Sequence, residues 1–130
     1  FVKDDILFVT GRIKDMIIID GMNHYPQDIE RTMELSHQSI RPGCCAAFSV
    51  EVNGQERLAV VAEAVLDNET DAKSVIGAIR RAISEEHDQR AYKVCLIAPR
   101  TIDKTSSGKI QRQSTRRGFL EGTLEVLAVE

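Results

Sequence analysis

The chain has 130 residues, of which 42% are hydrophobic and 28% are charged, and its formal net charge is −3. This length suits one compact domain, which buries roughly two-thirds of the surface that its unfolded chain exposes. The acidic balance argues against a domain built mainly to bind nucleic acid, because such domains are normally basic. No apolar stretch approaches the ~20 residues of a membrane-spanning helix, so no membrane span is predicted.

Two elements are predicted in the first third of the chain. Residues 6–10 and 13–19 are β-rich and flank a bend at residues 11–12, which predicts an N-terminal β-hairpin. Pro26 suits the first turn of a helix, and residues 41–43, Arg-Pro-Gly, are predicted to end that helix.

The middle of the chain is the most strongly patterned part. Residues 44–52 and 57–66 predict two strands with apolar side chains at every second position, joined by an Asn-Gly turn at residues 53–54. Residues 70–87 have the apolar spacing of an amphipathic helix, and residues 94–98 fit a short third strand.

A polar loop is predicted over residues 101–109 and a basic helix from about Ile110, while residues 123–130 fit either a strand or a tail. The order of elements predicts the α+β class: a small domain with an N-terminal β-hairpin and a short three-stranded sheet packed by helices.

Cysteine and histidine usage predicts reduced thiols and no metal site. The three cysteines cannot all pair within one chain, and Cys44 and Cys45 stand in an apolar run. Without a visible secretion signal, this pattern predicts buried thiols and a cytoplasmic setting. The three histidines are far apart in the sequence, and no Cys-x-x-Cys pair exists.

Positive charge is concentrated in one segment. Residues 100–117 carry six basic residues and one acidic residue, a net charge of +5 in a chain that is acidic overall. Residues 104–109 read Lys-Thr-Ser-Ser-Gly-Lys; small residues let backbone N–H groups approach an anion, and a lysine supplies a mobile charge. A P-loop is excluded, because Asp103 and Ile110 replace its glycine and its Ser or Thr. From the residues alone, a phosphate-binding loop and a solvated basic loop both remain open.

Two spaced motifs resemble one superfamily. Residues 99–112, above all Thr-Ser-Ser-Gly-Lys-Ile-Gln-Arg at 105–112, resemble the closing motif of the adenylate-forming enzymes, which include acyl-CoA synthetases, nonribosomal peptide adenylation domains and luciferases. That motif is Pro-Lys-Thr-x-Ser-Gly-Lys, and this chain departs from it at Asp103, which replaces the proline. Thr-Gly-Arg-Ile-Lys-Asp at 10–15 resembles the passage from the superfamily's large N-terminal domain to its small C-terminal one. The resemblance covers nearly the whole chain.

The resemblance implies that residues 1–130 are the small, mobile C-terminal domain of such an enzyme, and that residues 1–14 include the hinge from a missing N-terminal domain. The first residue, Phe1 rather than Met, also favours a fragment. By similarity, Arg12 would hydrogen-bond the ribose of the nucleotide, and Lys14 would be the hinge residue.

The same resemblance makes Lys109 the catalytic residue, whose ammonium group would stabilise charge on the α-phosphate of ATP during adenylation. Thr105, Ser107 and Gly108 would support the phosphate loop. ATP with Mg²⁺ would be bound mainly by the N-terminal domain, so the fragment alone is expected to hold no cofactor and to show no adenylation.

Residues 20–30, Asp-Gly-Met-Asn-His-Tyr-Pro-Gln-Asp-Ile-Glu, resemble fatty acyl-AMP ligases in particular. Gly21, Asn23 and His24 would then belong to an active-site loop, although Met22 replaces the basic residue expected there. Such ligases activate a fatty acid and pass the acyl group to an acyl carrier protein or to a carrier domain of a polyketide synthase.

Two alternatives remain open at this point. The chain could be the same domain of a fatty acyl-CoA ligase, or a non-catalytic binding or regulatory module that kept the fold. A further hypothesis concerns the basic helix, whose Arg112, Arg116 and Arg117 could dock an acidic carrier protein or form a plain solvated face.

Overall fold

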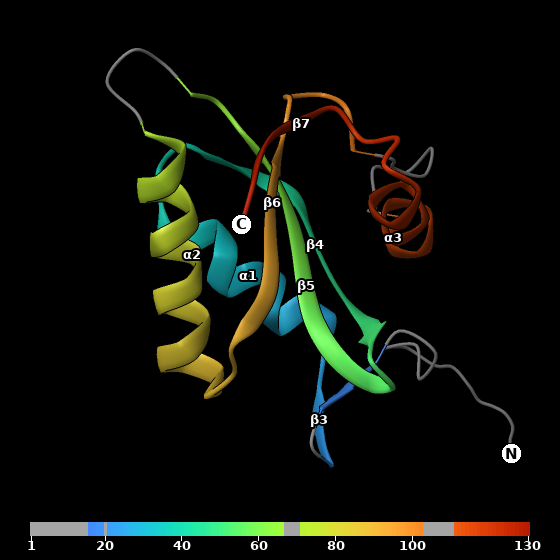
Figure 1. The fold of residues 1–130 in the computed structure, drawn as a ribbon. Helices are drawn as coiled ribbons and strands as arrows, with labels where there is room; N and C mark the ends of the chain where they lie inside the picture. Colours follow the sequence, from blue (N-terminus) through green and yellow to red (C-terminus); the bar gives the residue numbers. More distant parts are fainter. Residues whose placement is uncertain (1–15, 20, 67–70, 103–110) are drawn as a thin grey trace, which may run out of the picture.

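The computed structural model describes residues 16–19, 21–66, 71–102 and 111–130 (Figure 1). The described elements are β2 (Ile17–Ile19), β3 (Met22–His24), α1 (Pro26–Ser36), β4 (Ile40–Val52), β5 (Gln55–Ala64), α2 (Ala72–His87), β6 (Ala91–Ile97), α3 (Arg112–Glu121) and β7 (Val126–Val129). They form an antiparallel β2–β3 hairpin and a four-stranded mixed sheet with helices packed on it, which confirms the predicted α+β class. The predicted strand at residues 6–10 and its bend lie outside the described residues.

The β4–β5 hairpin forms at the predicted Asn-Gly turn. Asn53 and Gly54 have φ values of 53° and 78°, and Val52 pairs with Gln55 across the turn. Two consecutive left-handed residues match the right-handed twist of the flanking strands, which is why Asn-Gly is favoured at such turns. The predicted helix at residues 70–87 is likewise confirmed as α2.

Helices cover both faces of the sheet, whose order is β4-β5-β6-β7 with a parallel β5–β6 pair. In Figure 1, α1 and α2 lie on one side of the sheet and α3 on the other. Each face has its own apolar cluster, one including Val60 and Ile79 and the other including Phe48 and Val61. Because both faces are covered, residues 58–64 are all buried.

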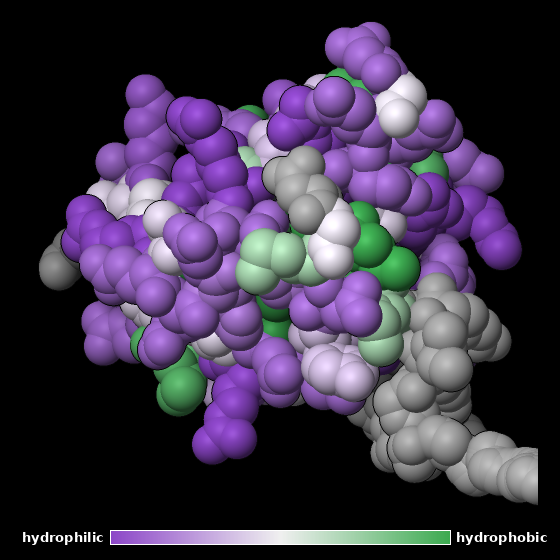
Figure 2. All heavy atoms as spheres, turned by 90° about the horizontal axis from the view of Figure 1, so that it is seen from below, coloured by the Kyte–Doolittle hydropathy of each residue, from purple (hydrophilic) through white to green (hydrophobic). Residues whose placement is uncertain are grey.

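Among the described residues, some large apolar side chains lie outside these clusters and are exposed, including Leu35 and the three large apolar residues of β7. The face in Figure 2 is covered mainly by hydrophilic side chains, with apolar side chains in small separate areas. None of the described helices is long and apolar enough to cross a membrane.

The structure corrects two predictions, the end of the first helix and the number of strands in the main sheet. Helix α1 ends at Ser36, and residues 41–43 lie inside β4 instead of ending the helix. Pairing between β4 and β5 is irregular between Ile40 and Cys45, and such an interruption on an edge strand tolerates a proline, which cannot donate to a ladder. The main sheet has four strands instead of three, because residues 126–129 pair with β6 as β7.

Two glycines on different helices give a matched test of this packing. A Cβ atom at Gly118 would lie 2.9 Å from Cδ2 of Leu124, whereas one at Gly77 would meet nothing within 4 Å. We expect Gly118→Ala to lower the free energy of unfolding by up to about 2 kcal/mol, because overpacking against Leu124 outweighs the gain in helix propensity. Gly77→Ala should raise it by up to about 1 kcal/mol through helix propensity. Urea denaturation of the chain measures both, and a change of the same sign in the two variants would contradict the packing of α3.

Candidate functional site

Three predicted site residues fall within the described structure, and all three lie on the β2–β3 hairpin. Gly21 has a φ of 77°, a conformation that favours glycine. Gly21 and Asn23 are exposed, whereas His24 is only 8% exposed. The remaining predicted site residues lie outside the described residues: Arg12, Lys14, Thr105, Ser107, Gly108 and Lys109.

The imidazole of His24 sits in a different environment from its two exposed neighbours. Its Nε2 atom is buried without a hydrogen-bond partner among the described residues. Burial, and secondarily the charge that His87 can carry, lower the pKa of His24 below its ordinary value. The lowered pKa favours the neutral form of the His24 imidazole.

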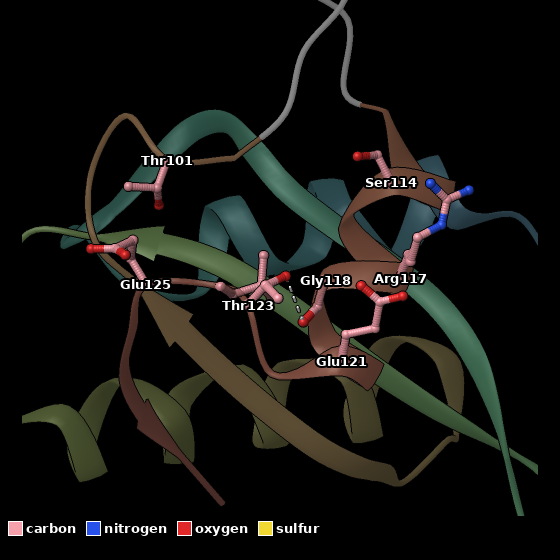
Figure 3. A pocket seen from close by; sticks show the side chains of 8 residues that line it. Thr101, Ser114, Arg117, Gly118, Glu121, Thr123 and Glu125 are labelled. Atoms are coloured by element: carbon pink, nitrogen blue, oxygen red, sulfur yellow. Dashed lines mark hydrogen bonds between the residues drawn. The ribbon is translucent and has the colours of Figure 1, made fainter.

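A pocket of about 320 Å³ lies beside α3 (Figure 3). Arg117 is the cation in its wall, and Glu121 and Glu125 are the carboxylates. The full lining consists of Thr101, Ser114, Arg117, Gly118, Glu121, Thr123, Leu124 and Glu125. Across the described residues, no group of three or more His, Cys, Asp or Glu could hold a metal ion. The mixed charges of this wall favour no single class of ligand.

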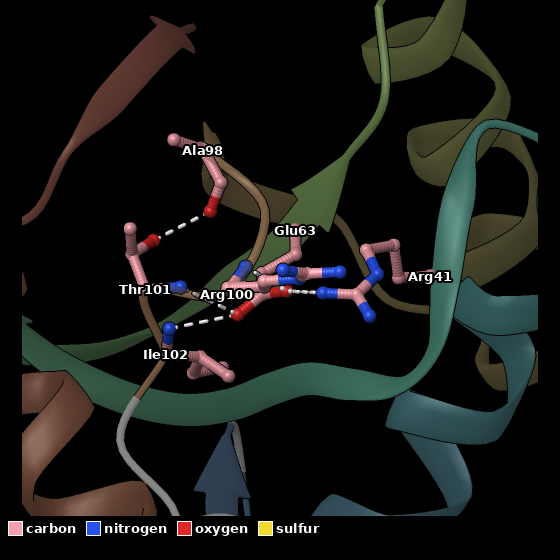
Figure 4. Close-up of polar contacts among 6 residues, drawn as sticks. All are labelled: Arg41, Glu63, Ala98, Arg100, Thr101 and Ile102. Atoms are coloured by element: carbon pink, nitrogen blue, oxygen red, sulfur yellow. Dashed lines mark hydrogen bonds and ion pairs between the residues drawn. The ribbon is translucent and has the colours of Figure 1, made fainter.

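The strongest polar site is the buried carboxylate of Glu63, near the end of β5 (Figure 4). Glu63 is 1% exposed. Its Oε1 accepts the N–H of Arg100 at 2.7 Å, and its Oε2 accepts those of Thr101 at 3.0 Å and Ile102 at 2.8 Å. The guanidinium of Arg41, on β4, donates to Oε1 at 2.7 Å. One side chain therefore holds three consecutive backbone N–H groups directly after β6.

The backbone at residues 100–102 needs such a partner. Arg100 has a φ of 68°, a left-handed conformation that costs an L-residue roughly 1–2 kcal/mol. The hydroxyl of Thr101 donates to the carbonyl of Ala98 at 2.5 Å, which is a hydrogen bond inside the turn itself. Since the N–H groups of the turn point at Glu63, the carboxylate compensates for the strained conformation.

The same donors keep Glu63 ionised. Burial alone would raise the pKa of this carboxyl, but the N–H groups of Ile102 and Arg100, the Arg41 guanidinium and Cys44 outweigh burial and lower the pKa below its ordinary value. A buried carboxylate that accepts several backbone N–H groups is stabilised in its charged form.

A second buried carboxylate, Glu30 of α1, links three elements. It is 6% exposed, and its two oxygens accept from Nε and Nη2 of Arg112 at 2.6 and 2.8 Å, a bidentate pair. Oε2 also accepts the N–H of Ala47 on β4 at 2.9 Å. Burial raises the pKa of Glu30 above its ordinary value, and the contacts with Arg112 and Ala47 only partly offset burial.

Helix α3 uses its arginines to dock on the sheet. Besides the pair made by Arg112, Nε of Arg116 donates to the carbonyl of Ser49 on β4 at 2.8 Å. Phe119, three residues further along α3, packs on Phe48 with the ring centroids 5.7 Å apart. The hypothesis that three arginines form one basic docking face is therefore wrong, because Arg112 and Arg116 face the sheet.

Glu63 and Glu30 are absent from the residues predicted from the sequence, although one signal points to Glu63. It follows residues 58–62, which are all apolar, and a single charge in such a strand is seldom buried unless it is paired. Glu30 has a weaker signal, since it lies beside Ile29 and three residues before Met33 on the buried side of α1.

Solved structures similar to this chain include fatty acid AMP ligases. A fatty acyl-adenylate ligase from a study of the E. coli and L. pneumophila enzymes has a TM-score of 0.72 and 34% identity; the match covers 94% of this chain and 21% of that chain. A fatty acid AMP ligase from Legionella pneumophila has a TM-score of 0.68 and 28% identity, over 82% of this chain and 19% of that chain. The chain has the fold of adenylate-forming ligases, and the predicted superfamily is confirmed.

Relatives with similar sequences show which family within this superfamily the chain belongs to. The medium-chain-fatty-acid–[acyl-carrier-protein] ligase JamA of Moorena producens (strain JHB) is 55% identical over 127 residues, covering 96% of this chain and 22% of that ligase. The long-chain-fatty-acid–AMP ligase FadD32 of Mycolicibacterium smegmatis (strain ATCC 700084 / mc(2)155) is 38% identical, covering 93% of this chain and 22% of the relative. The chain belongs to the Disco-interacting protein 2-like AMP-domain family, whose model matches residues 14–129. It thus spans about a fifth of the length of the ligases it matches.

The lowered pKa of Glu63 predicts how the stability of the chain depends on acid. A carboxyl whose pKa is lower when folded stabilises the fold above its ordinary pKa, and this contribution is lost as the pH falls through the lower, folded value. Glu63→Gln should cost about 1–3 kcal/mol near neutral pH, because an NH2 group replaces one of the two acceptor oxygens and cannot accept from the buried N–H donors. The difference between the two proteins should be largest near neutral pH and should shrink as the pH falls below 4.5, the ordinary pKa of this carboxyl, and through the lower, folded value.

Urea denaturation across this pH range is the measurement, and Glu85→Gln, at an exposed position on α2, is the matched control. A Glu63→Gln deficit that stays constant with pH would show that the native carboxylate is not held in its charged form.

Proposed function

We propose that this chain is the C-terminal domain of a fatty acyl-AMP ligase and that it supplies the catalytic Lys109 to a larger N-terminal domain. The observation that carries the proposal is the 55% identity, over 96% of the chain, to a ligase that joins medium-chain fatty acids to an acyl carrier protein. The share of that ligase covered, 22%, fits one small domain of a longer enzyme. Residues 1–14 would include the hinge.

The proposed chemistry begins with a fatty acid and ATP with Mg²⁺, bound mainly by the N-terminal domain. A carboxylate oxygen of the fatty acid bonds to the α-phosphorus, and the bond from that phosphorus to the leaving pyrophosphate breaks. Negative charge gathers on the α-phosphate oxygens, where the Lys109 ammonium stabilises it more in the transition state than in the ground state. Arg12 would bind the ribose hydroxyls, and Thr105, Ser107 and Gly108 would support the phosphate loop.

The second half-reaction passes the acyl group to an acceptor. We propose that the domain rotates about Lys14 between the two steps and brings the hairpin with Gly21, Asn23 and His24 toward the active site. The proposed acceptor is an acyl carrier protein or the carrier domain of a polyketide synthase, in a cytoplasmic setting. The carrier protein named for the JamA relative supports this acceptor over coenzyme A.

The first test compares the full-length protein containing this chain with its Lys109→Ala variant. With labelled fatty acid, ATP and Mg²⁺, the wild type should accumulate acyl-AMP and ignore added coenzyme A, but load an added carrier protein. The variant should form acyl-AMP on the order of 100- to 1000-fold more slowly, as expected when one electrostatic donor is removed. Lys73→Ala, at an exposed position on α2, is the matched lysine control and should keep full activity.

Each alternative has its own outcome in this assay. Formation of acyl-CoA would assign the domain to a fatty acyl-CoA ligase, and no acyl-AMP at all would favour a binding or regulatory module. The isolated 130-residue chain should form no acyl-AMP. Release of pyrophosphate by the pure chain would contradict a division of labour between two domains.

A further inference from the structure

His24 is a buried titratable group on a part of the fold that is weakly attached. Among the buried side-chain nitrogen and oxygen atoms of the described residues, its Nε2 is the atom without a hydrogen-bond partner. We propose that His24 makes the β2–β3 hairpin an acid-sensitive element, which stays docked on the domain while the ring is neutral and opens away from it when the ring takes up a proton. This inference goes beyond the proposed function, because it concerns the fold of the chain and no catalytic step.

The hairpin is held to the domain by side chains rather than by backbone pairing. Strands β2 and β3 pair with each other, and among the described residues no backbone hydrogen bond joins them to the four-stranded sheet. In Figure 1 the hairpin projects from one end of that sheet. A two-stranded hairpin is at best marginally stable by itself, so this one depends on its contacts with the domain. It is therefore the kind of unit that can open without global unfolding.

His24 is one of three buried side chains in the two strands. The other two, Ile17 and Ile19, belong to the apolar cluster that includes Val60 and Ile79. His24 pairs with Ile17 across the hairpin, and residues directly opposite in an antiparallel pair lie on the same face. The three remaining strand residues are exposed: Ile18, Met22 and Asn23. A change at His24 therefore acts on the face by which the hairpin docks.

The charged group that acts on His24 comes from α2. Burial, and secondarily His87 in the last turn of α2, lower the pKa of His24 below its ordinary value of 6.5. The carboxylates of α1 and α2, Asp28 and Glu86 included, are not among the causes of this shift. Among the described residues, a protonated His24 therefore faces a like charge and no counter-ion.

His87 can carry its charge without leaving its place. Its Nε2 lies 2.8 Å from Oγ1 of Thr32, and that hydroxyl donates to the carbonyl of Asp28 at 3.1 Å. A hydroxyl has one hydrogen to give, so with that hydrogen on the Asp28 carbonyl, Nε2 of His87 is the donor. A ring that donates from Nε2 keeps this bond when its other nitrogen takes up a proton. Acid therefore adds charge at His87 in place, and this charge opposes protonation of His24.

His24 has no comparable way to take up a proton in place. An imidazolium donates from both nitrogens, and the buried Nε2 has no acceptor among the described residues. A buried charge without a partner is costly, so such a group stays neutral or moves into water. For His24, the move into water requires the hairpin to open.

The direction of the pH dependence follows from the lowered pKa. In the open hairpin His24 has its ordinary pKa of 6.5, and in the docked hairpin it has a lower one. Docking is therefore strongest above pH 6.5 and weakens as the pH falls, because the open form binds the proton first. The ratio of open to docked hairpin should rise by up to about tenfold per pH unit, until the pH reaches the pKa of the docked state.

NMR spectroscopy of the 130-residue chain from about pH 7.5 to about pH 5 tests the proposal. The ring of His24 should titrate with a midpoint below 6.5. Hydrogen-exchange protection factors at residues 17–19 and 22–24 should fall by up to about tenfold per pH unit, while the amides of the β5–β6 ladder keep their protection. Constant protection in the hairpin would overturn the proposal, and so would an equal fall in the ladder, which is global unfolding.

Three variants assign the effect to His24. His24→Gln removes the titrating ring and should make the protection of the hairpin independent of pH over this range. His87→Gln removes the like charge, while its amide can still donate to Thr32, so His24 should titrate closer to 6.5 and the fall in protection should be smaller. His37→Gln is the matched control: this histidine ends α1 and accepts the Ser39 N–H, so its loss should leave the wild-type pH dependence.

The variants also define how the proposal fails. A His24→Gln chain with the wild-type pH dependence would assign the effect to another group and overturn the proposal, as would loss of the effect in His37→Gln. If His24→Gln does not fold, His24→Phe, which keeps an aromatic ring and takes up no proton, replaces it with the same expected result. Because none of these measurements needs catalysis, a failed test of the proposed function leaves their outcome unaffected.

Discussion

A charge buried inside a sheet needs hydrogen-bond donors, and in this domain the Glu63 carboxylate takes them from two parts of the chain. Glu63 lies on β5 and is 1% exposed. Its carboxylate accepts hydrogen bonds from Arg41 on β4 and from the backbone of the turn after β6. An unpaired carboxylate there would cost several kcal/mol. The left-handed conformation of Arg100 costs less than this, and it lets the Arg100 N–H donate to the carboxylate. The path of the chain beyond β6 thus follows from one side chain.

The free edge of β4 poses a second, related requirement. As an edge strand, β4 has unpaired backbone groups, and edges of this kind need to be covered. Glu30 accepts the Ala47 N–H, and Arg116 donates to the Ser49 carbonyl, so side chains from α1 and α3 satisfy two of these groups. The contact between Phe48 and Phe119 then adds apolar area. Polar bonds to β4 therefore contribute more to the docking of α3 than an apolar helix face does.

Features fixed by local chemistry could be predicted from the sequence. The Asn53-Gly54 turn and the apolar stripe of α2 need only nearby residues, and both form as predicted. The resemblance to adenylate-forming enzymes was likewise carried by contiguous motifs, and the matching family model bears it out. The sequence does not distinguish a strand from a tail at β7, because its large apolar side chains are about half exposed and give no alternating pattern of burial.

Features that depend on pairing across the fold could not be predicted. Arginine is normally exposed, so nothing local indicated that Arg112 and Arg116 face inward, and the basic helix suggested a docking face instead. The partners of Glu63 stand 22 and 37–39 positions away, and no local pattern connects them. Of the predicted site, the hairpin residues alone fall within the described structure.

The two buried carboxylates, Glu63 and Glu30, share one electrostatic property. Each has its own guanidinium, Arg41 for Glu63 and Arg112 for Glu30, so each site is close to neutral as a unit. Because the arginines neutralise the two carboxylates locally, the domain can use buried acids to orient its backbone without leaving an unpaired buried charge.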